Sequence, residues 1–313
     1  MPQTINTNIV SMNAQRNLNM SQTSLATSMQ RLSSGLRVNS AKDDAAGLAI
    51  AERMNTQVRG MNVAIRNAND GISLAQTAEG ALGKIGDNLQ RMRELAVQSR
   101  NSTNSDGDRA NLQKEFKQLQ EEISRTVGGA RFNGKPLFDS GAPTTLSFQV
   151  GAGTDVTDRI DIDGAVLGGG TAGTATVVSS TSATAAQDLL ATVTANWDGT
   201  NGLAIGGGAS GAATNIATTS QIDDAINVID AALDVVNDKR ASFGASQNRF
   251  EAVIANLQVS VENQAAARGR IMDADFAAET ANLSRSQILQ QAGTAMVAQA
   301  NQLPQQVLSL LGR

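Results

Sequence analysis

Residues 222–271 read IDDAINVIDAALDVVNDKRASFGASQNRFEAVIANLQVSVENQAAARGRI. Along this stretch, the positions that are apolar, or that continue the apolar series, are separated by alternating steps of four and three residues. They are Ile222, Ile226, Ile229, Leu233, Val236, Arg240, Phe243, Gln247, Phe250, Ile254, Leu257, Val261, Gln264, Arg268 and Ile271. A 3.5-residue repeat gives one narrow stripe on a long helix, and the stripe stays buried only when another helix covers it. The stretch therefore predicts a rod of roughly 75 Å that packs against partner helices.

A matching stripe runs through an expected helix from about residue 44 to residue 100. Its steps change phase once, at Ile72, Ala75 and Ala78, where two successive steps of three overwind a coiled coil locally. A third expected helix ends at Gly128 and Gly129 and carries a further stripe. The two stripes comprise Met54, Val58, Met61, Ile65, Ala68, Ile72, Ala75, Ala78, Leu82, Ile85, Leu89, Met92 and Ala96, and then Leu112, Phe116, Leu119, Ile123 and Val127. We expect the three helices to cover one another's stripes within one chain.

The N-terminal segment carries a weaker helical pattern. Residues 1–40 are rich in Asn, Gln, Ser and Thr, and their apolar residues lie at loose helical spacing. Such a helix has too little apolar surface to fold firmly alone. Gly35 and the polar residues 39–44 predict a break, after which Ser40 or Asp43 is expected to cap the next helix. The apolar positions most suited to a contact are Ile5, Ile9, Leu32 and Leu36.

The C-terminal segment is predicted to form a last helix after the sequence MDADF at residues 272–276. Pro304 should end or kink it, because proline lacks a donor and clashes with the preceding turn. An apolar chain end such as VLSLL at residues 307–311 indicates a surface that is covered only on assembly. The candidate contact residues here are Ile288, Leu289, Met296, Leu303, Val307, Leu308 and Leu311.

The middle of the chain has a different character. LSFQV at residues 146–150 and RIDID at residues 159–163 alternate with the two-residue period of strands. Residues 164–220 are dominated by Gly, Ala, Ser and Thr, so this region is expected to bury little. The predicted fold is mainly α with a small β-rich middle: an antiparallel bundle of long helices from both termini, plus an outer β and loop domain.

Composition excludes several classes of function. The net charge is −4 and the isoelectric point is near 5.0, which argues against a nucleic-acid partner. The chain contains no Cys and no His, so it lacks thiolate chemistry, disulfides and the commonest general base and metal ligand. No apolar run is long enough to span a membrane, and the first residues do not resemble a cleaved signal peptide. We expect no membrane partner, and a protein that is cytosolic or leaves the cell without such a signal.

Three sets of residues are weak candidates for chemistry. Residues 155–163 include four aspartates spaced somewhat like a calcium loop, but the alternation favours the outer face of a hairpin: Asp155, Asp158, Asp161 and Asp163. The glycine-rich residues 202–211 lack the Lys-Ser/Thr ending of a phosphate loop. The carboxylates Glu115, Glu121 and Glu122 favour a solvated helix face over a catalytic cleft. We therefore predict no catalytic residue, no metal and no cofactor.

Several long blocks closely resemble bacterial flagellin. They are QRLSSGLRVNSAKDDAAGLAIAERM (Gln30–Met54), RNANDGISLAQTAEGAL (Arg66–Leu82), NLQRMRELAVQSRNSTNS (Asn88–Ser105), FNGKPLF (Phe132–Phe138) and LSRSQILQQAGTAMVAQANQLPQQVLSLL (Leu283–Leu311). The resemblance covers about residues 1–165 and 220–313. It implies a secreted structural protein, not an enzyme, that polymerises into the flagellar filament and is exported unfolded through the flagellar type III system.

The resemblance also implies domains and partners. Residues 1–44 and 272–313 would form the inner tube of the filament, residues 45–164 and 220–271 a helical rod with a hairpin, and residues 165–219 a variable exposed domain. The partners would be further copies of the chain, the hook-associated junction and cap proteins, an export chaperone at the C-terminal segment, and the host Toll-like receptor for flagellin. Receptor recognition would involve Arg91, Glu94, Leu95, Gln98 and Glu115.

Two other functions compete with the filament subunit. A hook–filament junction protein shares the same terminal architecture, although the blocks at residues 39–54 and 288–311 match such proteins poorly. An adhesin role of residues 165–219 is compatible with filament formation. A hydrolase displayed on the filament is disfavoured by the missing His and Cys.

Overall fold

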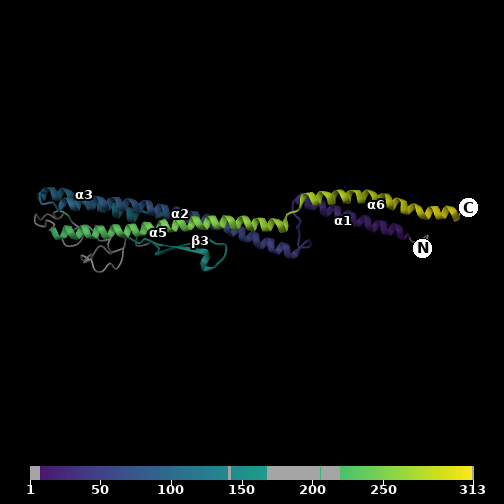
Figure 1. Ribbon diagram of the computed structural model, residues 1–313, viewed down its shortest axis with the longest axis horizontal. Helices are drawn as coiled ribbons and strands as arrows, with labels where there is room; N and C mark the ends of the chain where they lie inside the picture. The colour runs from purple at the N-terminus through teal and green to yellow at the C-terminus, as the bar shows by residue number, and fades with distance from the viewer. Residues whose placement is uncertain (1–7, 140–141, 168–204, 206–218, 312–313) are drawn as a thin grey trace. The chain divides into compact units, whose positions relative to one another are not determined.

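The computed structural model describes residues 8–139, 142–167, 205 and 219–311, with residues 219–220 and 303–311 described by their backbone alone. It confirms the predicted mainly helical fold with a small β middle (Figure 1). The helices are α1 (Ile9–Ser34), α2 (Ala45–Ser99), α3 (Asp106–Gly129), α5 (Thr219–Met272) and α6 (Phe276–Leu311). The strands are β1 (Arg131–Phe132), β2 (Lys135–Pro136), β3 (Thr145–Gln149) and β4 (Arg159–Asp163), with the short 3₁₀ helix η1 (Val156–Asp158) before β4.

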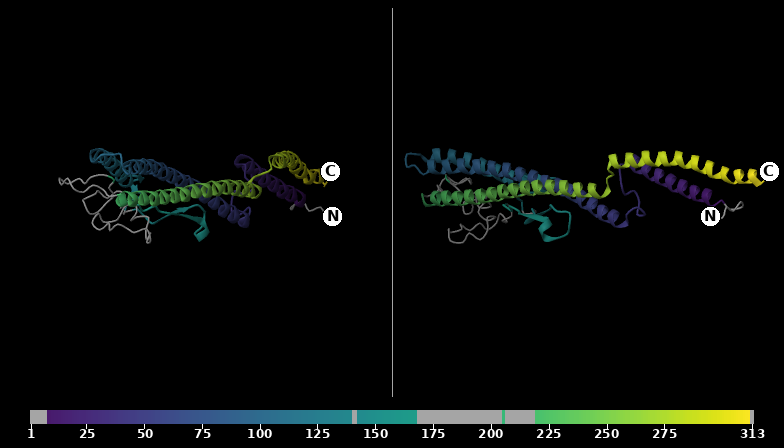
Figure 2. Two further views of the ribbon diagram at one scale, coloured as in Figure 1. Left: turned by 60° about the vertical axis from the view of Figure 1, so that its left-hand side comes forward. Right: turned by 45° about the vertical axis from the view of Figure 1, so that its right-hand side comes forward.

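The chain divides into two compact units, and both boundaries fall inside long helices. The terminal unit contains residues 1–59 and 259–313, and the rod unit contains residues 60–258. In the rod unit, α2 lies beside α3 and α5 (Figures 1 and 2). The ion pairs of α2 with α5 show that the two helices are antiparallel, because Arg93 pairs with Asp230 and the later Arg100 pairs with the earlier Asp223.

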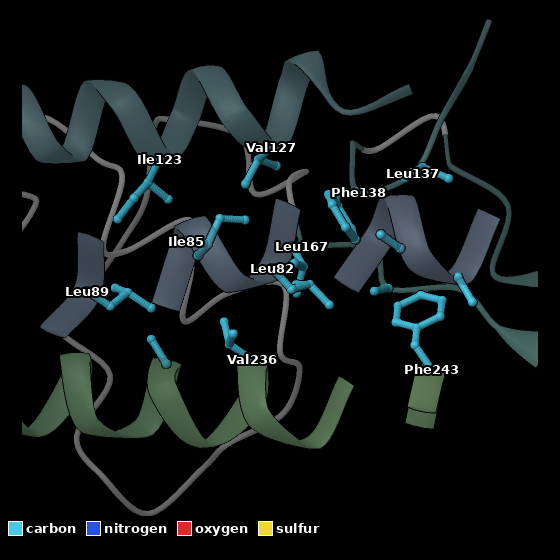
Figure 3. Packing of buried hydrophobic residues seen from close by; sticks show 14 of the residues in the cluster. Leu82, Ile85, Leu89, Ile123, Val127, Leu137, Phe138, Leu167, Val236 and Phe243 are labelled. Carbon is cyan, nitrogen blue, oxygen red and sulfur yellow. The ribbon is translucent and has the colours of Figure 1, made fainter. Parts of the chain in front are cut away.

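The core of the rod unit is built from the predicted stripes. On α2, Leu82, Ile85 and Leu89 are fully buried, and they meet α3 on one side and α5 on the other (Figure 3). The seam of α3 supplies Ile123, and the seam of α5 supplies Val236. The expectation that the three stripes cover one another within one chain is therefore confirmed for the α5 stripe as far as Phe250. Beyond it the stripe is only half-buried, as at Ile254 and Leu257, or exposed, as at Arg268. Complete burial of an aliphatic side chain stabilises the fold by about 1.5–3 kcal/mol.

Two antiparallel hairpins follow α3. The turn between β1 and β2 is made by Asn133 and Gly134, whose φ angles of 48° and 78° are those of the tight hairpin turn that Asn-Gly favours. Strands β3 and β4 pair so that Phe148 lies opposite Ile160. Alternation along β4 buries its two isoleucines and exposes its aspartates. The predicted hairpin is confirmed, and the predicted outer face is confirmed at Asp161 and Asp163. Asp158 is instead half-buried at the end of η1, and Asp155 precedes that helix.

The aromatic ring of Phe250 fixes the packing of α2 against α5. It meets Phe148 edge-on, with ring centroids 5.6 Å apart. It also lies against Gly71 of α2, where an added Cβ would be 2.7 Å from Cζ of Phe250. At this position only a glycine lets the helix backbone approach the ring so closely.

We expect opposite effects from two glycine substitutions in α2. Gly71→Ala should lower the free energy of unfolding by about 1–3 kcal/mol, because the new methyl group overpacks a filled core. Gly80→Ala should raise it by about 0.5–1 kcal/mol, because nothing lies within 4 Å of the new Cβ and alanine favours the helix. Guanidinium unfolding of both variants measures the difference. Equal stabilities would contradict the close contact at Gly71.

A part of the chain expected to bury little contributes to the core. Ala165, Leu167 and Ile205 are fully or almost fully buried within the same cluster as the helix stripes. The Ile205 N–H donates to Oε1 of Gln113 at 2.7 Å, and the Ser99 hydroxyl donates to the Ile205 carbonyl. The expectation of little burial is wrong at these three residues. The remainder of the glycine-rich stretch at residues 202–211 lies outside the described residues.

The helices begin after the breaks that the sequence predicts, but the residue that caps α2 differs from the prediction. Ser105 and Asp108 form a reciprocal capping box at the start of α3. At the start of α2 the cap is Asp44, whose carboxylate accepts the Gly47 N–H at 2.8 Å, so the prediction of Ser40 or Asp43 is wrong. Asp43 instead accepts N–H groups within the preceding loop, and these bonds, first that from Asn39, hold the pKa of its carboxyl below the ordinary value.

The last helix differs from expectation at its only proline. The sequence predicts an end or a kink at Pro304; helix α6 continues past it to Leu311, so the first of these two outcomes is wrong. Proline removes one intrahelical hydrogen bond, but the turns that follow it can still form.

Candidate functional site

The terminal unit pairs the first and last helices of the chain through polar side chains. The Asn8 amide donates to the Ala300 carbonyl at 2.7 Å, and the Ser11 hydroxyl donates to Oδ1 of Asn301 at 2.7 Å. Further along, Arg31 of α1 lies 3.9 Å from the carboxylate of Glu279. Rising numbers on α1 thus meet falling numbers on α6, so the two helices are antiparallel, and they run side by side in Figures 1 and 2.

The interior of this helix pair is unusually polar. Its buried side chains include Ser11 and Ser28 on α1, and Glu279 and Ser286 on α6. Among the described side chains of the two helices, Ala300 is the only fully buried apolar one. Serine and alanine are small, so the two backbones can approach closely, but they bury little apolar area. The pair therefore derives little hydrophobic stabilisation from its own interface.

The exposed surface of the same pair is apolar. Nine of the fourteen exposed large hydrophobic side chains in the described ranges lie on α1 or α6: Ile9, Val10, Met12, Met20, Met29, Phe276, Ile288, Leu289 and Met296. A soluble helix pair normally places such residues between its helices, with polar residues outside. This reversed distribution marks a surface that becomes stable when other molecules cover it.

An open groove of 460 Å³ lies between the two helices at mid-length. Met20 contributes to it from α1, and Leu289 and Arg285 contribute from α6. Serine and asparagine side chains complete the lining. The groove thus combines apolar side chains with hydrogen-bonding groups, a combination suited to receiving a side chain of another helix.

The segments that lead out of α1 and into α6 are held together by backbone bonds. Gly35 ends α1 with φ 70°, and its carbonyl accepts the Ala274 N–H at 2.9 Å. The Arg37 N–H donates to the Met272 carbonyl at 2.6 Å, and its guanidinium donates to the Ile271 carbonyl at 2.8 Å. We call this contact of residues 35–38 with residues 271–274 the terminal clasp. It fixes where the two helices of the pair begin to run together.

The predicted polymerisation residues separate into three groups. Ile9, Ile288, Leu289 and Met296 are exposed on the helix pair. Leu32 and Leu36 are half-buried, and Leu36 packs in the small cluster of Val38, Ala51 and Met272 beside the terminal clasp. The side chains of the remaining five lie outside the described residues: Ile5, Leu303, Val307, Leu308 and Leu311.

Three of the predicted recognition residues form one charged cluster on the rod unit. Arg91 of α2 donates to Oε1 of Glu115 on α3 at 2.8 Å and to Oε2 of Glu94 at 3.0 Å. All three side chains are well exposed. The two carboxylates, Glu94 first, raise the pKa of the Arg91 guanidinium above its ordinary value. The cluster therefore presents a fixed pattern of charge to solvent.

The other two recognition residues are not equivalent to these. Gln98 is exposed on α2, one helical turn after Glu94. Leu95 has only 1% of its side chain exposed and belongs to the core of the rod unit. An external molecule can reach the charged cluster directly but cannot touch Leu95 in this fold.

Two of the carboxylates considered for chemistry, Glu115 and Glu122, are in ion pairs with arginines. Glu122 pairs with Arg125 at 2.8 Å on the exposed face of α3, and this bond holds the pKa of its carboxyl below the ordinary value. Within the described ranges, no group of three or more His, Cys, Asp or Glu side chains is placed to hold a metal ion. In the same part of the chain, no helix has the length and apolar character needed to cross a membrane.

Polar interior, apolar exterior and long antiparallel helices together define a structural subunit whose surface is completed by assembly. Residues 5–142 match the family model of the bacterial flagellin N-terminal helical region, and residues 226–311 match that of the C-terminal helical region. The chain belongs to the bacterial flagellin family. It is a structural, non-enzymatic subunit of the extracellular flagellar filament, which serves motility, and it polymerises with copies of itself.

Individual relatives agree with this family over nearly their whole length. A flagellin from Halalkalibacterium halodurans is 43% identical over 98% of this chain and 99% of the relative. A flagellin from Xenorhabdus nematophila is 46% identical over 99% of this chain and 100% of the relative. These relatives favour the filament subunit over the hook–filament junction protein.

Among solved structures, the fold resembles that of a protein described as flagellar hook-associated, from Vibrio parahaemolyticus. The TM-score is 0.55 and the identity 13%, with 74% of this chain and 100% of that chain covered. At this identity the likeness concerns the fold alone.

Proposed function

We propose that the pair of α1 and α6 is the part of the subunit through which the filament polymerises. The observation that carries this proposal is the reversed burial: polar side chains lie inside the pair and nine large apolar side chains lie outside it. Each Ile, Leu, Met or Phe that a neighbouring subunit covers contributes about 1.5–3 kcal/mol, which a polar interface within the pair does not supply. Substitution of Ile288 and Leu289 by asparagine tests the proposal, as argued in the Discussion.

The proposal extends to the three domains expected from the sequence. Residues 1–44 and 272–313 form the inner tube, and residues 45–164 and 220–271 form the surrounding rods. Residues 165–219 form the outer domain that faces the medium, anchored to the rod by the buried Ala165, Leu167 and Ile205. The reversed burial in the α1–α6 pair supports the assignment of the inner tube. The apolar core shared by α2, α3 and α5 supports the second assignment. A rod whose helices bury one another's apolar stripes needs no partner to stay folded.

In this proposal, the proteins that bind the subunit during export and at the filament ends contact the same terminal helices. An export chaperone covers the segment from about Ser284 before assembly, and the hook-associated junction and cap proteins contact the helix pair at the two ends of the filament. The apolar exposed face of α6 supports a protective partner, since a free apolar helix face promotes aggregation. The absence of Cys from the sequence suits export of an unfolded chain, because no disulfide can obstruct its passage.

We further propose that the cluster of Arg91, Glu94 and Glu115 is the surface that the host Toll-like receptor for flagellin recognises, together with Gln98. Its support is geometric: the three charged side chains are exposed and held in one arrangement by two hydrogen bonds. A preformed arrangement loses little side-chain entropy on binding. In this proposal Leu95 acts indirectly, by packing α2 beneath the cluster.

Arg91→Ala is expected to reduce receptor signalling by the monomer about tenfold, because arginines at the centre of an interface commonly contribute 1.4 kcal/mol or more. Reporter cells that express the receptor measure the effect over a range of monomer concentrations. Arg93→Ala is the matched control, since Arg93 is equally exposed on α2 and also forms an interhelix ion pair, at 2.6 Å to Asp230. Equal signalling by the two variants would refute the recognition surface.

A further inference from the structure

Sulfur in this chain is confined to methionine, and the methionines are sharply divided between exposed positions on α1 and α6 and covered positions elsewhere. The chain has nine methionines and no cysteine. Met12, Met20, Met29 and Met296 are 56–63% exposed, and all four lie on α1 or α6. By contrast, Met61, Met92 and Met272 are at most 8% exposed. Met54 is half-buried, and Met1 lies outside the described residues.

The exposed four occupy the surface on which polymerisation depends in the proposal above. Met20 lines the groove between α1 and α6, opposite Leu289. The unbranched thioether side chain of methionine adapts its shape to a partner and is well suited to irregular apolar contacts. Conversion to the sulfoxide makes the same side chain polar and chiral, so it no longer fits a dry contact.

We propose that Met12, Met20, Met29 and Met296 form an oxidative modification site that controls assembly: a peroxide oxidises them in the free subunit, and the oxidised subunit cannot join a filament. This inference rests on the proposed role of the α1–α6 pair. It adds a chemical regulation that the polymerisation role does not itself require.

The reaction balances with hydrogen peroxide as the oxidant. A lone pair of the methionine sulfur attacks one peroxide oxygen, the S–O bond forms and the O–O bond breaks. The leaving oxygen takes up the proton released from the transferred one and becomes water. The thioether is oxidised by two electrons to the sulfoxide, and the peroxide is reduced by two. Methionine sulfoxide reductases reverse the change, one enzyme for each sulfoxide epimer.

The free subunit and the filament differ in susceptibility. In the free subunit the four sulfur atoms are open to solvent, whereas neighbouring subunits cover this face in the filament. Oxidation should therefore select against subunits that have not yet assembled and should leave existing filaments largely intact. Met61, Met92 and Met272 serve as internal references, because burial within the folded subunit protects them in both states.

The experiment treats purified full-length monomer with hydrogen peroxide and locates the sulfoxides by peptide mass spectrometry. We expect the four exposed methionines to be oxidised about tenfold or more faster than the three buried ones. Filament formation, followed by light scattering and electron microscopy, should be lost, while the thermal unfolding of the rod unit should not change. Treatment with both sulfoxide reductases and a thiol reductant should restore assembly, and the reductant has no disulfide to attack in this chain.

The matched variant replaces all four residues by leucine, which keeps volume and apolar character. It should assemble equally well before and after peroxide. Oxidised wild-type monomer that still assembles, or that fails to recover after the reductases act, would overturn the inference. Equal loss of assembly by the peroxide-treated leucine variant would overturn it too. If the leucine variant itself does not assemble, the inference is tested by whether the reductases restore assembly of the oxidised wild-type monomer.

The same assay separates this inference from the proposed polymerisation role. A variant with Ile288→Asn and Leu289→Asn serves as the reference for that role. If it assembles normally, the polymerisation surface is wrong and the inference falls with it. If it fails to assemble while fully oxidised wild type succeeds, the surface stands and only the oxidative control is wrong.

Discussion

Replacing Ile288 and Leu289 together by asparagine is expected to stop filament growth while the folded monomer remains intact. Both side chains are exposed on α6, at 65% and 50%, so their replacement removes little internal packing. The change should alter the stability of the monomer by no more than about 1 kcal/mol, through the lower helix propensity of asparagine. In a contact between subunits it removes at least about 3 kcal/mol of apolar burial and introduces two amides to be buried. The critical concentration for polymerisation should therefore rise by about a hundredfold or more.

Sedimentation of filaments over a range of monomer concentrations measures that critical concentration. Circular dichroism and thermal unfolding of the monomer supply the check on folding. The matched control is Ile288→Val with Leu289→Met, which keeps both positions apolar and should polymerise like the wild type. Normal filaments from the asparagine variant would show that this face of α6 is not an assembly surface.

Ile205→Ala is expected to lower the free energy of unfolding of the rod unit by about 2–5 kcal/mol. Ile205 has no exposed surface and packs in the same cluster as the stripes of α2, α3 and α5. Its backbone is also bonded on both sides, to Gln113 and to Ser99. Truncation leaves a cavity that these fixed helices cannot easily close. Guanidinium unfolding, followed by helical circular dichroism, measures the loss as a lower midpoint with an unchanged slope.

Val156→Ala is the control for that experiment. Val156 belongs to the same unit and is also β-branched, but it is 82% exposed, so its truncation should change stability by at most about 0.5 kcal/mol. A loss at Ile205 no larger than the loss at Val156 would mean that Ile205 does not anchor the middle segment in solution.

Periodicity predicted the rod well because its core obeys one simple repeat. The stripe from Ala75 through Leu82 to Leu89 is buried along its length, including the phase change before Ala78. The hairpin was predictable for the same reason, since the two-residue alternation in RIDID separates Ile160 and Ile162 from the aspartates. In both cases one face of an element is covered and the other is solvated, and the sequence records that difference directly.

Other features of the structure cannot be recognised from a periodic pattern in the sequence. Ile205 is one isoleucine among Gly, Ala and Ser, so no period surrounds it, and its burial depends on residues about 90–105 positions away. Leu95 lies beside the α2 stripe rather than on it, and it is buried because α3 and α5 cover a wider face of α2 than a single partner would. Aspartates 43 and 44 are equivalent by residue type, and only the path of the chain decides which of them caps α2.

The terminal helices show the limit of hydrophobic patterns most clearly. Their contact with each other includes hydrogen bonds of Ser11, Ser24 and Ser286, which a pattern of apolar residues cannot identify, beside the contact of Leu18 with Gly293. The sequence predicts apolar residues of both helices as candidate contacts, but it does not indicate that Ile9, Ile288 and Met296 are exposed on the pair rather than buried within it. That orientation follows from the polar hydrogen bonds, which fix the rotation of each helix about its axis.

The bond from Asn8 to Ala300 joins positions 292 residues apart. During synthesis, α1 therefore emerges long before the helix that pairs with it exists. A contact of such long range forms late, because its loop must close before the contact gains anything. The rod unit, whose helices lie nearer in sequence, can fold without waiting. The two terminal helices cannot pair while the chain is incomplete. The helix pair therefore forms only after residues 276–300 have been synthesised.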